Sequence, residues 1–410
     1  MQTDYAYIDD KGNLVLPVEL SERYGLVKGS RVKLSGHSDR IILHRPVSQL
    51  SRVYVEPTNI CNLLCKMCMR NVWEEAQGRM EMDTFERILD GVRAVTPRPS
   101  LFFGGIGEPL SHPEIFEMAR RAKAAGAGVE LITNGTLLDE HRSLELLESG
   151  IDRLWVSIDG ATPESYTDVR LGSELPRVVE NLKTLRILKF KRMNKKPDLG
   201  ISFVAMKQNI GEIPQVIQLA SRVGAKHISI SNMLPHTKEQ SGDILYSRSM
   251  YDSPKGWIEV SMTRMDMTKD AADVLEKLIR GYYGAQLKGL ELLWPSDTCP
   301  FFERGSLSVR FDGEVSPCIP LLHSHRSYLE DRERINHSLS FGSVLGRTLM
   351  EIWNDAEYVK LRERLLDFDF SPCTLCNSCE LADSNEEDCF GNVSPACGGC
   401  LWAQGFVRCP

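Results

Sequence analysis

The stretch Cys61-Asn62-Leu63-Leu64-Cys65-Lys66-Met67-Cys68 follows a short apolar segment at residues 53–55. It places three cysteines in the spacing Cys-x3-Cys-x2-Cys. Iron–sulfur cubanes normally take four cysteine thiolates, so a loop that supplies three leaves one iron for another ligand. The stretch therefore predicts an iron–sulfur cluster with an open coordination position, held just after a β-strand.

Three other uses of these cysteines are open. A disulfide framework is typical of exported proteins, but the chain opens Met1-Gln2-Thr3-Asp4, without the basic and apolar segments of a secretion signal. A zinc site needs a fourth ligand at short spacing, which the neighbouring sequence lacks. Unligated core cysteines do not gather as the nine further cysteines of the C-terminal region do. The sequence favours the cluster.

The same stretch resembles the signature of the radical S-adenosylmethionine (SAM) superfamily, with Val53-Tyr54-Val55 as the strand and Asn62 and Met67-Cys68-Met69 in the loop. In that family SAM occupies the open iron of a [4Fe-4S] cluster. The resemblance implies reductive cleavage of SAM to a 5′-deoxyadenosyl radical, which removes a hydrogen atom from a substrate. It also implies a low-potential electron donor, a ferredoxin or a flavodoxin.

Composition argues against several classes of function. The 410 residues carry a net charge of −7, which gives no global attraction to nucleic acid or to anionic membranes. No apolar run approaches the roughly 18 residues that a membrane-spanning helix needs. Twelve cysteines without a secretion signal indicate metal binding in a reducing compartment, so we expect a cytoplasmic protein.

Residues 1–48 predict a small β-rich domain with one helix, at 19–24, closed by Gly25. The strands are expected at 5–9, 14–17, 31–34 and 41–44. This region resembles the AbrB/SpoVT-type swapped-hairpin module, which is often found in DNA-binding regulators. The positions that match are Asp9, Gly12, Leu16-Pro17 and Gly29-Ser30.

The charge of this region argues against DNA binding. Asn13 stands where the module usually has a basic residue, and residues 1–50 hold seven Lys/Arg against six Asp/Glu. Basic side chains supply most of the affinity for DNA, so DNA is an unlikely partner. A module this small buries little apolar surface alone, which favours protein docking or a homodimer through this domain.

From residue 51 to 235 apolar strands alternate with amphipathic helices, which predicts parallel strands with crossover helices. The expected strands are 53–55, 101–104, 129–133, 154–158, 201–206 and 227–233. Six such units resemble the partial (β/α)6 barrel of radical SAM enzymes. The fold class is therefore α/β, with active-site groups expected at the C-terminal ends of the strands.

Chemistry-bearing residues follow four of these strands. Gly104-Gly105-Ile106-Gly107-Glu108 follows the second strand, and glycines there let backbone groups approach a ligand closely. By resemblance, the SAM-binding residues are Gly105, Ile106, Gly107, Glu108, Thr133, Asn134, Ser157, Asp159 and Arg170. Short hydroxyl and amide groups suit the ribose, and an arginine fork suits the SAM carboxylate; a solvated surface arginine is the alternative for Arg170. No catalytic side chain can be named from the sequence.

A connector at 236–290, with a helix expected at 271–283, leads into a second cysteine-rich region at 291–410. The turn Asp312-Gly313 followed by Cys318 resembles the opening of the SPASM domain, which carries auxiliary iron–sulfur clusters; a helix is expected at 343–366. The candidate ligands are Cys299, Cys318, Cys373, Cys376, Cys379, Cys389, Cys397, Cys400 and Cys409.

Nine cysteines exceed by one the number that two four-thiolate clusters require. We expect Cys299 and Cys318 on one auxiliary cluster and Cys373 with Cys376 on the other. Zinc-ribbon pairs of the type Cys373-x2-Cys376 are the alternative, because their local spacing is also correct.

Three functions follow. The AbrB-like head and the ending from Cys397 to Cys409 resemble the maturases proposed for tungsten-containing aldehyde oxidoreductases, which implies a protein, peptide or tungstopterin oxidoreductase as substrate. The second is a ribosomal-peptide cross-linking enzyme. The third is a redox-sensing regulator that uses its iron–sulfur clusters and binds DNA. Formation of 5′-deoxyadenosine by the reduced protein separates the two enzymes from the regulator.

Overall fold

A computed structural model of the chain describes residues 5–410 apart from a set of short gaps. The gaps are 27, 29, 31, 37–40, 74, 171–174, 247–257, 262–269, 271–272, 275–284, 289–297, 330–331 and 374–378. At 167–168, 258–261 and 285–288 only the backbone is described.

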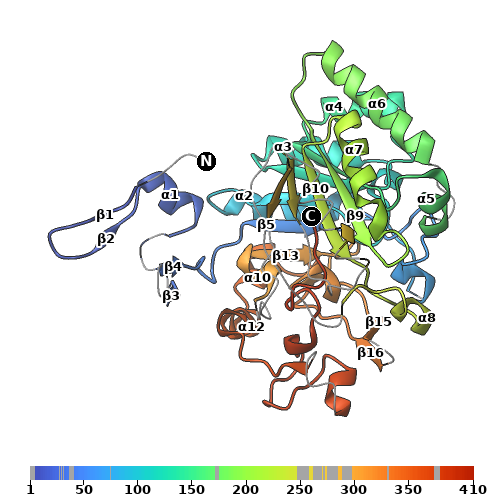
Figure 1. Cartoon of the computed structure of the whole chain (residues 1–410). Coiled ribbons are helices and arrows are strands. Elements are labelled where there is room, and N and C mark those ends of the chain that lie inside the picture. Colours follow the sequence, from blue (N-terminus) through green and yellow to red (C-terminus); the bar gives the residue numbers. More distant parts are fainter. Residues whose placement is uncertain are drawn as a thin grey trace.

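A single large sheet forms the centre of the molecule (Figure 1). Its strand order is β12-β11-β10-β9-β8-β7-β6-β5-β13-β14, and every neighbouring pair is parallel except β13 with β14. The six predicted strands are confirmed as β5 (Arg52–Val55), β6 (Ser100–Phe103), β7 (Val129–Thr133), β8 (Arg153–Ser157), β9 (Asp198–Ala205) and β10 (His227–Asn232). This is the predicted α/β architecture.

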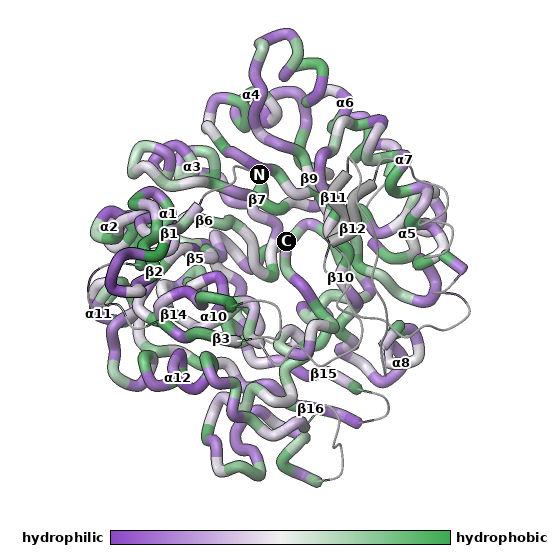
Figure 2. The backbone as a smooth tube through the Cα atoms, turned by 60° about the vertical axis from the view of Figure 1, so that its left-hand side comes forward, coloured by the Kyte–Doolittle hydropathy of each residue, from purple (hydrophilic) through white to green (hydrophobic). Residues whose placement is uncertain are grey.

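The helices that connect these strands cover the outside of the sheet (Figure 2). They are α2 (Met82–Ala94), α3 (Ile115–Ala124), α4 (Glu140–Glu148), α5 (Pro163–Val169), α6 (Leu175–Lys191) and α7 (Ile213–Val223). In α2, apolar side chains at Phe85, Ile88, Leu89 and Val92 recur at helical spacing and are fully buried. These side chains pack with the outward-pointing side chains of the strands in one hydrophobic core. This packing fixes the direction in which each strand ends.

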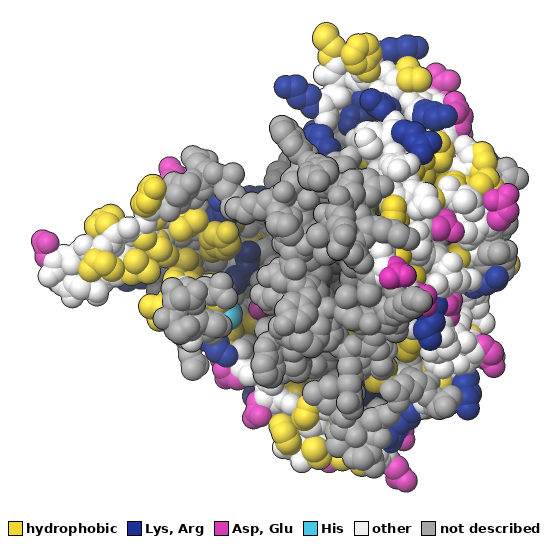
Figure 3. Space-filling view, viewed as in Figure 1, with side chains coloured by type: hydrophobic (Ala, Val, Ile, Leu, Met, Phe, Trp, Pro, Cys, Tyr) yellow, Lys and Arg dark blue, Asp and Glu magenta, His cyan; other side chains and the backbone are white. Residues whose placement is uncertain are grey.

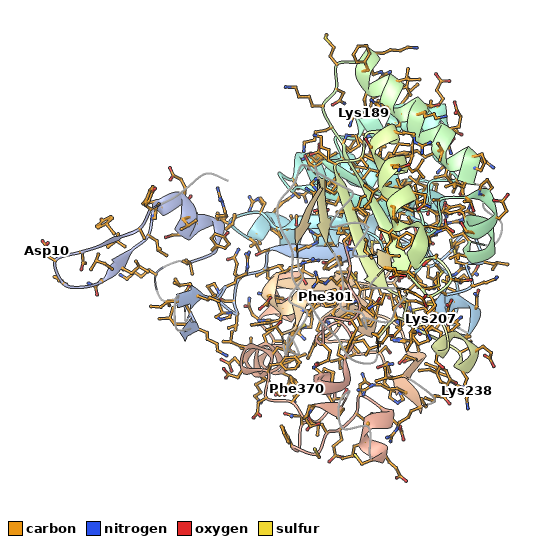
Figure 4. The ribbon with its side chains drawn as sticks, viewed as in Figure 1. Asp10, Lys189, Lys207, Lys238, Phe301 and Phe370 are labelled. Atoms are coloured by element: carbon orange, nitrogen blue, oxygen red, sulfur yellow. The ribbon has the colours of Figure 1, made fainter. Side chains whose placement is uncertain are left out.

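The opposite face of the sheet holds a second apolar cluster and the end of the chain. Side chains alternate along a strand, so Tyr54, Phe102 and Trp155 point inward and pack with Phe301. Figure 4 places Phe301 where the sheet meets the C-terminal region. The last residues run along this inner face, where the Asn232 amide donates to the Phe406 carbonyl at 2.9 Å. In Figure 2 the C-terminus accordingly lies within the ring of strands.

The connector contributes two strands that the sequence did not predict. β11 (Ile258–Ser261) and β12 (Ala285–Lys288) extend the parallel sheet beyond β10. The helix expected at 271–283 lies outside the described residues except at Asp273 and Val274, which are helical. A short helix, α8 (Lys238–Ser241), lies near the start of the connector.

The C-terminal region joins the other edge of the sheet through β13 (Ser306–Val309), which pairs with β5 and leads through a turn to β14 (Val315–Ser316). Its other elements are α10 (Pro300–Glu303), β15 (His325–Leu329), β16 (Arg332–Asn336), α11 (Leu349–Trp353) and α12 (Ala356–Asp367). The prediction of one helix over 343–366 is wrong. The chain breaks after Trp353 because Asp355 caps a new helix, accepting from the Glu357 amide at 3.0 Å.

The N-terminal region forms an arm that projects from the body (Figure 1). It contains β1 (Tyr7–Ile8), β2 (Leu14–Val15), α1 (Val18–Arg23), β3 (Leu34–Gly36) and β4 (Ile41–Leu43). The predicted order of elements is confirmed within these bounds, as two separate antiparallel pairs. Lys33 ties the arm to the body, donating to the Leu366 carbonyl at 2.7 Å. Within the described part of the chain, no helix is long and apolar enough to cross a lipid bilayer.

Candidate metal and cofactor site

The three cysteines of the predicted cluster lie on one loop after β5. Cys61, Cys65 and Cys68 are all partly buried, and the Cys68 amide donates to the Cys65 carbonyl at 3.0 Å. Burial raises the pKa of all three thiols, that of Cys68 to about 11. Thiols in such a setting become ligands only beside a positive metal centre, which deprotonates them. The donor set therefore fits an iron–sulfur cluster.

The glycine motif after β6 packs directly on this cysteine loop. A Cβ at Gly107 would lie 2.2 Å from the Thr58 carbonyl oxygen and 2.7 Å from that of Ile60. The Glu108 amide donates to the Ile60 carbonyl at 2.9 Å. Only glycine permits this contact, so the sequence of the motif sets where its backbone meets the cluster loop.

Glu108 joins the loop after β6 to the end of β7. Its carboxylate accepts from the Thr133 hydroxyl at 2.6 Å, the Asn134 amide at 2.7 Å and the Leu110 amide at 3.0 Å. Burial raises the pKa of Glu108, and these hydrogen bonds oppose the effect. The predicted residues Glu108, Thr133 and Asn134 therefore form one connected group.

Asn134 connects this group to the cysteines. Its side-chain amide donates to Asn62 Oδ1 at 2.9 Å and lies 3.9 Å from Cys61 Sγ. The Asn62 amide in turn donates to the Thr136 hydroxyl at 2.8 Å. Thr136 follows the predicted Thr133-Asn134-Gly135 run and escaped the sequence prediction.

Arg170 and Asp159 form a buried ion pair on the other side of the cysteine loop. Arg170 Nη2 lies 2.5 Å from Asp159 Oδ2, and its Nη1 donates to Cys65 Sγ at 3.8 Å. Burial alone would lower the pKa of Arg170, but Asp159 outweighs it and raises the pKa. Asp159 is fully buried and also accepts from the Val204 amide at 2.7 Å. Arg170 is thus not a solvated surface residue.

Ser157 lies at the end of β8, two residues before Asp159, and is half-buried. Gly105 and Ile106 lie across the site, against Glu56 at the end of β5: the Ile106 amide donates to Glu56 Oε1 at 3.1 Å. Apart from Arg170, which follows α5, every predicted SAM-binding residue lies at the C-terminal edge of the parallel strands or in the loops that follow. Among the described residues no group of three or more His, Cys, Asp or Glu side chains is arranged to hold one metal ion.

Five of the tail cysteines line one cavity in the C-terminal region. They are Cys299, Cys318, Cys373, Cys397 and Cys400. The empty volume of the cavity is about 950 Å³, including its opening to solvent. Burial and the neighbouring Cys299, Cys400 and Cys397 raise the pKa of Cys318, so these four sulfurs lie near one another. They come from segments almost 100 residues apart.

The two glycines between Cys397 and Cys400 allow this convergence. A Cβ at Gly398 would lie 1.7 Å from the Ser371 carbonyl oxygen, and one at Gly399 would lie 1.8 Å from Arg334 Nη1. Arg334 donates to the Ala382 carbonyl at 3.1 Å, which holds its guanidinium behind the cavity. Burial lowers the pKa of Arg334, while nearby cysteines oppose the effect.

The remaining tail cysteines are placed differently. Cys379 and Cys389 are exposed, and Cys376 lies outside the described residues. Cys409, like Cys299 and Cys318, packs against the aromatic cluster on the inner face of the sheet.

A buried group at the same strand edge escaped the sequence prediction. His323, which follows the Cys318 hairpin, contacts Glu56 at 2.8 Å and Glu75 at 2.5 Å. The one feature of the sequence that could have indicated this group is the position of Glu56 directly after a buried strand. Its partners come from distant parts of the sequence, so no local pattern announces the group.

Comparison with known proteins agrees with this arrangement. Residues 55–240 match the radical SAM superfamily and residues 299–380 match the SPASM iron–sulfur cluster-binding domain. The tungsten-containing aldehyde ferredoxin oxidoreductase cofactor-modifying protein of Pyrococcus furiosus is 33% identical over 87% of this chain and 96% of its own. The AdoMet-dependent heme synthase of Methanosarcina barkeri is 27% identical over 75% of this chain and 83% of its own.

Among solved structures, native anSMEcpe with bound AdoMet and the Cp18Cys peptide has a similar fold, with a TM-score of 0.54 and 17% identity over 88% of this chain and 92% of that one. Fold, site and sequence thus agree. This chain belongs to the radical SAM superfamily, carries a SPASM domain, and is an enzyme that uses iron–sulfur clusters and S-adenosylmethionine.

Proposed function

We propose that Cys61, Cys65 and Cys68 hold the cluster that binds SAM, and that the strand-end residues around them hold SAM itself. The bound cluster and SAM supply a 5′-deoxyadenosyl radical. The protein's part is to fix the positions of these groups. Asn134, after β7, and Arg170, at the end of α5, support this role because each reaches a cysteine sulfur, at 3.9 and 3.8 Å.

The residues around SAM divide by chemistry. The backbone of Gly105, Ile106 and Gly107 can approach the ligand closely, and the buried Glu108 carboxylate can face an ammonium group. Arg170 suits the carboxylate of SAM, since its Nε has no partner among the described residues. Thr133, Asn134, Ser157 and Asp159 suit the ribose and the methionine portion.

For the auxiliary clusters we propose Cys299, Cys318, Cys397 and Cys400 as the ligands of one. Their convergence on one cavity supports this set. The second cluster would then draw on Cys373, Cys376, Cys379, Cys389 and Cys409, one of which is spare. The division of the chain at 1–48, 51–235, 236–290 and 291–410 remains our proposal for its domains.

The substrate we propose is a tungsten-containing oxidoreductase or its tungstopterin cofactor, which this enzyme would modify. The single observation that carries this is the 33% identity to the cofactor-modifying protein of Pyrococcus furiosus, which spans 96% of that relative. Similarity over the whole relative includes the substrate-facing parts of both domains. We further propose a cytoplasmic location and a ferredoxin or flavodoxin as the electron donor.

The test uses a tungsten-containing aldehyde oxidoreductase made in cells that lack this enzyme. The reconstituted protein is incubated anaerobically with that oxidoreductase, SAM and a low-potential reductant, with Cys65→Ser as the inactive control. We expect 5′-deoxyadenosine and a rise in aldehyde oxidation with the wild-type protein alone. Nucleoside without any change in the oxidoreductase would reject this substrate and favour the peptide cross-linking alternative.

We also propose that the N-terminal arm pairs with the arm of a second copy. The arm leaves large apolar side chains in solvent, among them Tyr5 at 81%, Ile41 at 71% and Val18 at 69% exposure. Figure 3 shows hydrophobic side chains gathered on the arm, and Figure 4 shows Asp10 at its tip, far from the body. So much exposed apolar surface on so small a unit supports burial against a partner.

Sedimentation of the full-length chain tests this pairing. We expect a dimer for the wild-type protein and a monomer for Ile41→Glu. Phe190→Glu is the matched control, since Phe190 is 85% exposed on α6 of the body. A monomeric wild-type protein, or dissociation of both variants alike, would contradict the proposal.

A further inference from the structure

His323, from the C-terminal region, lies between two carboxylates of the barrel region, Glu56 and Glu75. Its Nε2 is 2.8 Å from Glu56 Oε2, and its Nδ1 is 2.5 Å from Glu75 Oε2. The imidazole is completely buried, and the Trp73 ring packs edge-on against it at 4.5 Å between ring centres. We call these three residues, Glu56, His323 and Glu75, the carboxylate–histidine trio.

The trio must share a proton. A neutral imidazole carries one N–H and can donate to only one of two carboxylates. Both contacts are satisfied only when the ring is an imidazolium or when one carboxyl group is protonated. Burial lowers the pKa of His323. Glu56 and Glu75 raise it by more than burial lowers it, so the pKa lies above its ordinary value.

The two ends of the trio face different surroundings. The Glu75 side chain is 31% exposed, whereas those of His323 and Glu56 are fully buried. Glu56 ends β5, and its Oε1 accepts from the Ile106 amide of the glycine motif at 3.1 Å. Gly105 packs so closely that a Cβ there would lie 2.8 Å from Glu56 Oε1. The trio thus runs from solvent to the strand edge where SAM binds.

Few other charged groups are near the trio among the described residues. Arg310 influences Glu75 electrostatically but pairs with Asp312, 2.6 Å away. His325 contacts the His323 carbonyl through Nδ1 at 3.1 Å, and burial lowers the pKa of His325. The position of the proton that the trio shares is therefore determined mainly by the two carboxylates of the trio itself.

We infer that the carboxylate–histidine trio is a proton relay that carries the proton released by the substrate from the barrel edge to solvent. This inference rests on the proposed function. If SAM supplied the group that takes a hydrogen atom, and an oxidised auxiliary cluster held by the cysteines of the cavity took an electron, the substrate would also lose a proton. Glu56 would take up this proton and pass it to Nε2 of His323, Nδ1 of the same ring would pass its own proton to Glu75, and Glu75 would release one proton to water. The substrate is then oxidised by two electrons.

A fixed structural contact would give the same distances, so the test measures movement of the proton. In cluster-loaded protein labelled with ¹⁵N-histidine, NMR follows exchange of the His323 ring N–H with water. Glu75→Gln keeps a hydrogen-bond acceptor but cannot take the proton. Because a carboxylate acts as the general base for this transfer, we expect exchange to slow roughly 10²-fold.

Glu386→Gln is the matched control, because Glu386 faces the half-exposed His337 at 3.8 Å and lies outside the trio. It should leave exchange at His323 unchanged. Equal exchange rates in wild type and Glu75→Gln would overturn the relay and leave the trio as a static contact. Both variants keep His323 in place, so loss of the fold is not expected to obscure the result.

The same samples are assayed for 5′-deoxyadenosine with SAM and titanium citrate. Cleavage of SAM consumes an electron and no proton, so Glu75→Gln should match the wild type within about twofold. No nucleoside from wild type would reject the proposed function while the exchange measurement still tests the relay. With the tungsten oxidoreductase as substrate, Glu56→Gln should lower product per nucleoside, because the inner acceptor is lost.

Discussion

The two cysteine regions of this enzyme are built in opposite ways. Cys61, Cys65 and Cys68 come from one short loop, and side chains from the ends of neighbouring elements contact that loop from outside, as Asn134 and Arg170 do. The auxiliary cavity gathers cysteines from segments that are far apart in sequence. A local loop can keep its geometry when one ligand is lost, whereas the auxiliary cluster would itself cross-link the C-terminal region.

Removal of one auxiliary ligand tests this difference most strongly. Cys318→Ser should lose the iron of one cluster, about four of roughly twelve atoms, and lower the unfolding temperature of the C-terminal region. Leu345→Ser is the control, since Leu345 is 54% exposed and is not among the proposed ligands. Iron analysis and calorimetry under anaerobic conditions measure both effects. Equal losses in the two variants would contradict the grouping around the cavity.

His323 joins the two regions, and its contribution should depend on pH. Its pKa in the folded protein is raised above the unfolded value of about 6.5. The stabilisation is therefore fully present below about pH 6.5 and lost as pH rises through the folded pKa. Because His323→Gln removes a buried charged group, the free energy of unfolding should fall by about 3 kcal/mol at pH 6.5 and by less at higher pH.

Unfolding in denaturant between pH 6.5 and 9 checks this expectation, with His337→Gln as the exposed control. If the difference in free energy of unfolding between the wild type and His323→Gln grew as pH rose, the expected sign of the pH dependence would be wrong.

Two glycines let each region be disturbed separately. Gly107→Ala drives a Cβ into the Thr58 carbonyl beside the cluster loop, and Gly398→Ala drives one into the Ser371 carbonyl beside the auxiliary cavity. Each should cost about 1–3 kcal/mol, because backbone cannot move aside. Gly211→Ala is the control, with no atom within 4 Å of the new Cβ.

We expect Gly107→Ala to impair SAM binding with little loss of auxiliary iron, and Gly398→Ala to do the reverse. Equilibrium dialysis with labelled SAM and iron analysis separate the two. If both variants lost both properties, the regions would not be independent.

The smallest expected effect concerns the ion pair behind the cysteine loop. Arg170→Lys keeps the charge beside Asp159 but loses the planar fork that reaches Cys65. Affinity for SAM should fall roughly 10-fold, the lower end of the range for residues that support metal ligands. Lys183→Arg on α6, in an exposed pair with Glu180, is the control and should bind SAM normally.

The sequence could predict the regular part of the fold because the decisive patterns there are local. The six central strands are apolar runs followed by amphipathic helices. The polar residues of the site directly follow several of these strands in the sequence. β11 and β12 escaped prediction because the connector lacks such runs. The break between α11 and α12 escaped because Asp355 acts as a cap only where the chain turns.

The residues of the site likewise divide into those that local sequence patterns predict and those that depend on the packing of distant segments. Asn134 and Asp159 could be assigned to one site because each follows a strand of the same parallel sheet, whereas Arg170 follows α5 and was assigned by resemblance. The grouping of Cys397 and Cys400 with Cys318 could not, because it depends on how distant segments pack. The contact of His323 with Glu56 joins residues 267 positions apart, and no spacing in the sequence encodes it.

The most direct test of the central claim is formation of 5′-deoxyadenosine by the anaerobically reconstituted, reduced protein. We expect the wild type to produce the nucleoside from SAM, and Cys65→Ser to produce none while it keeps its auxiliary clusters. A wild-type protein whose three-cysteine loop holds zinc, or whose reduced clusters leave SAM intact, would contradict the assignment of this loop to an open-iron cluster.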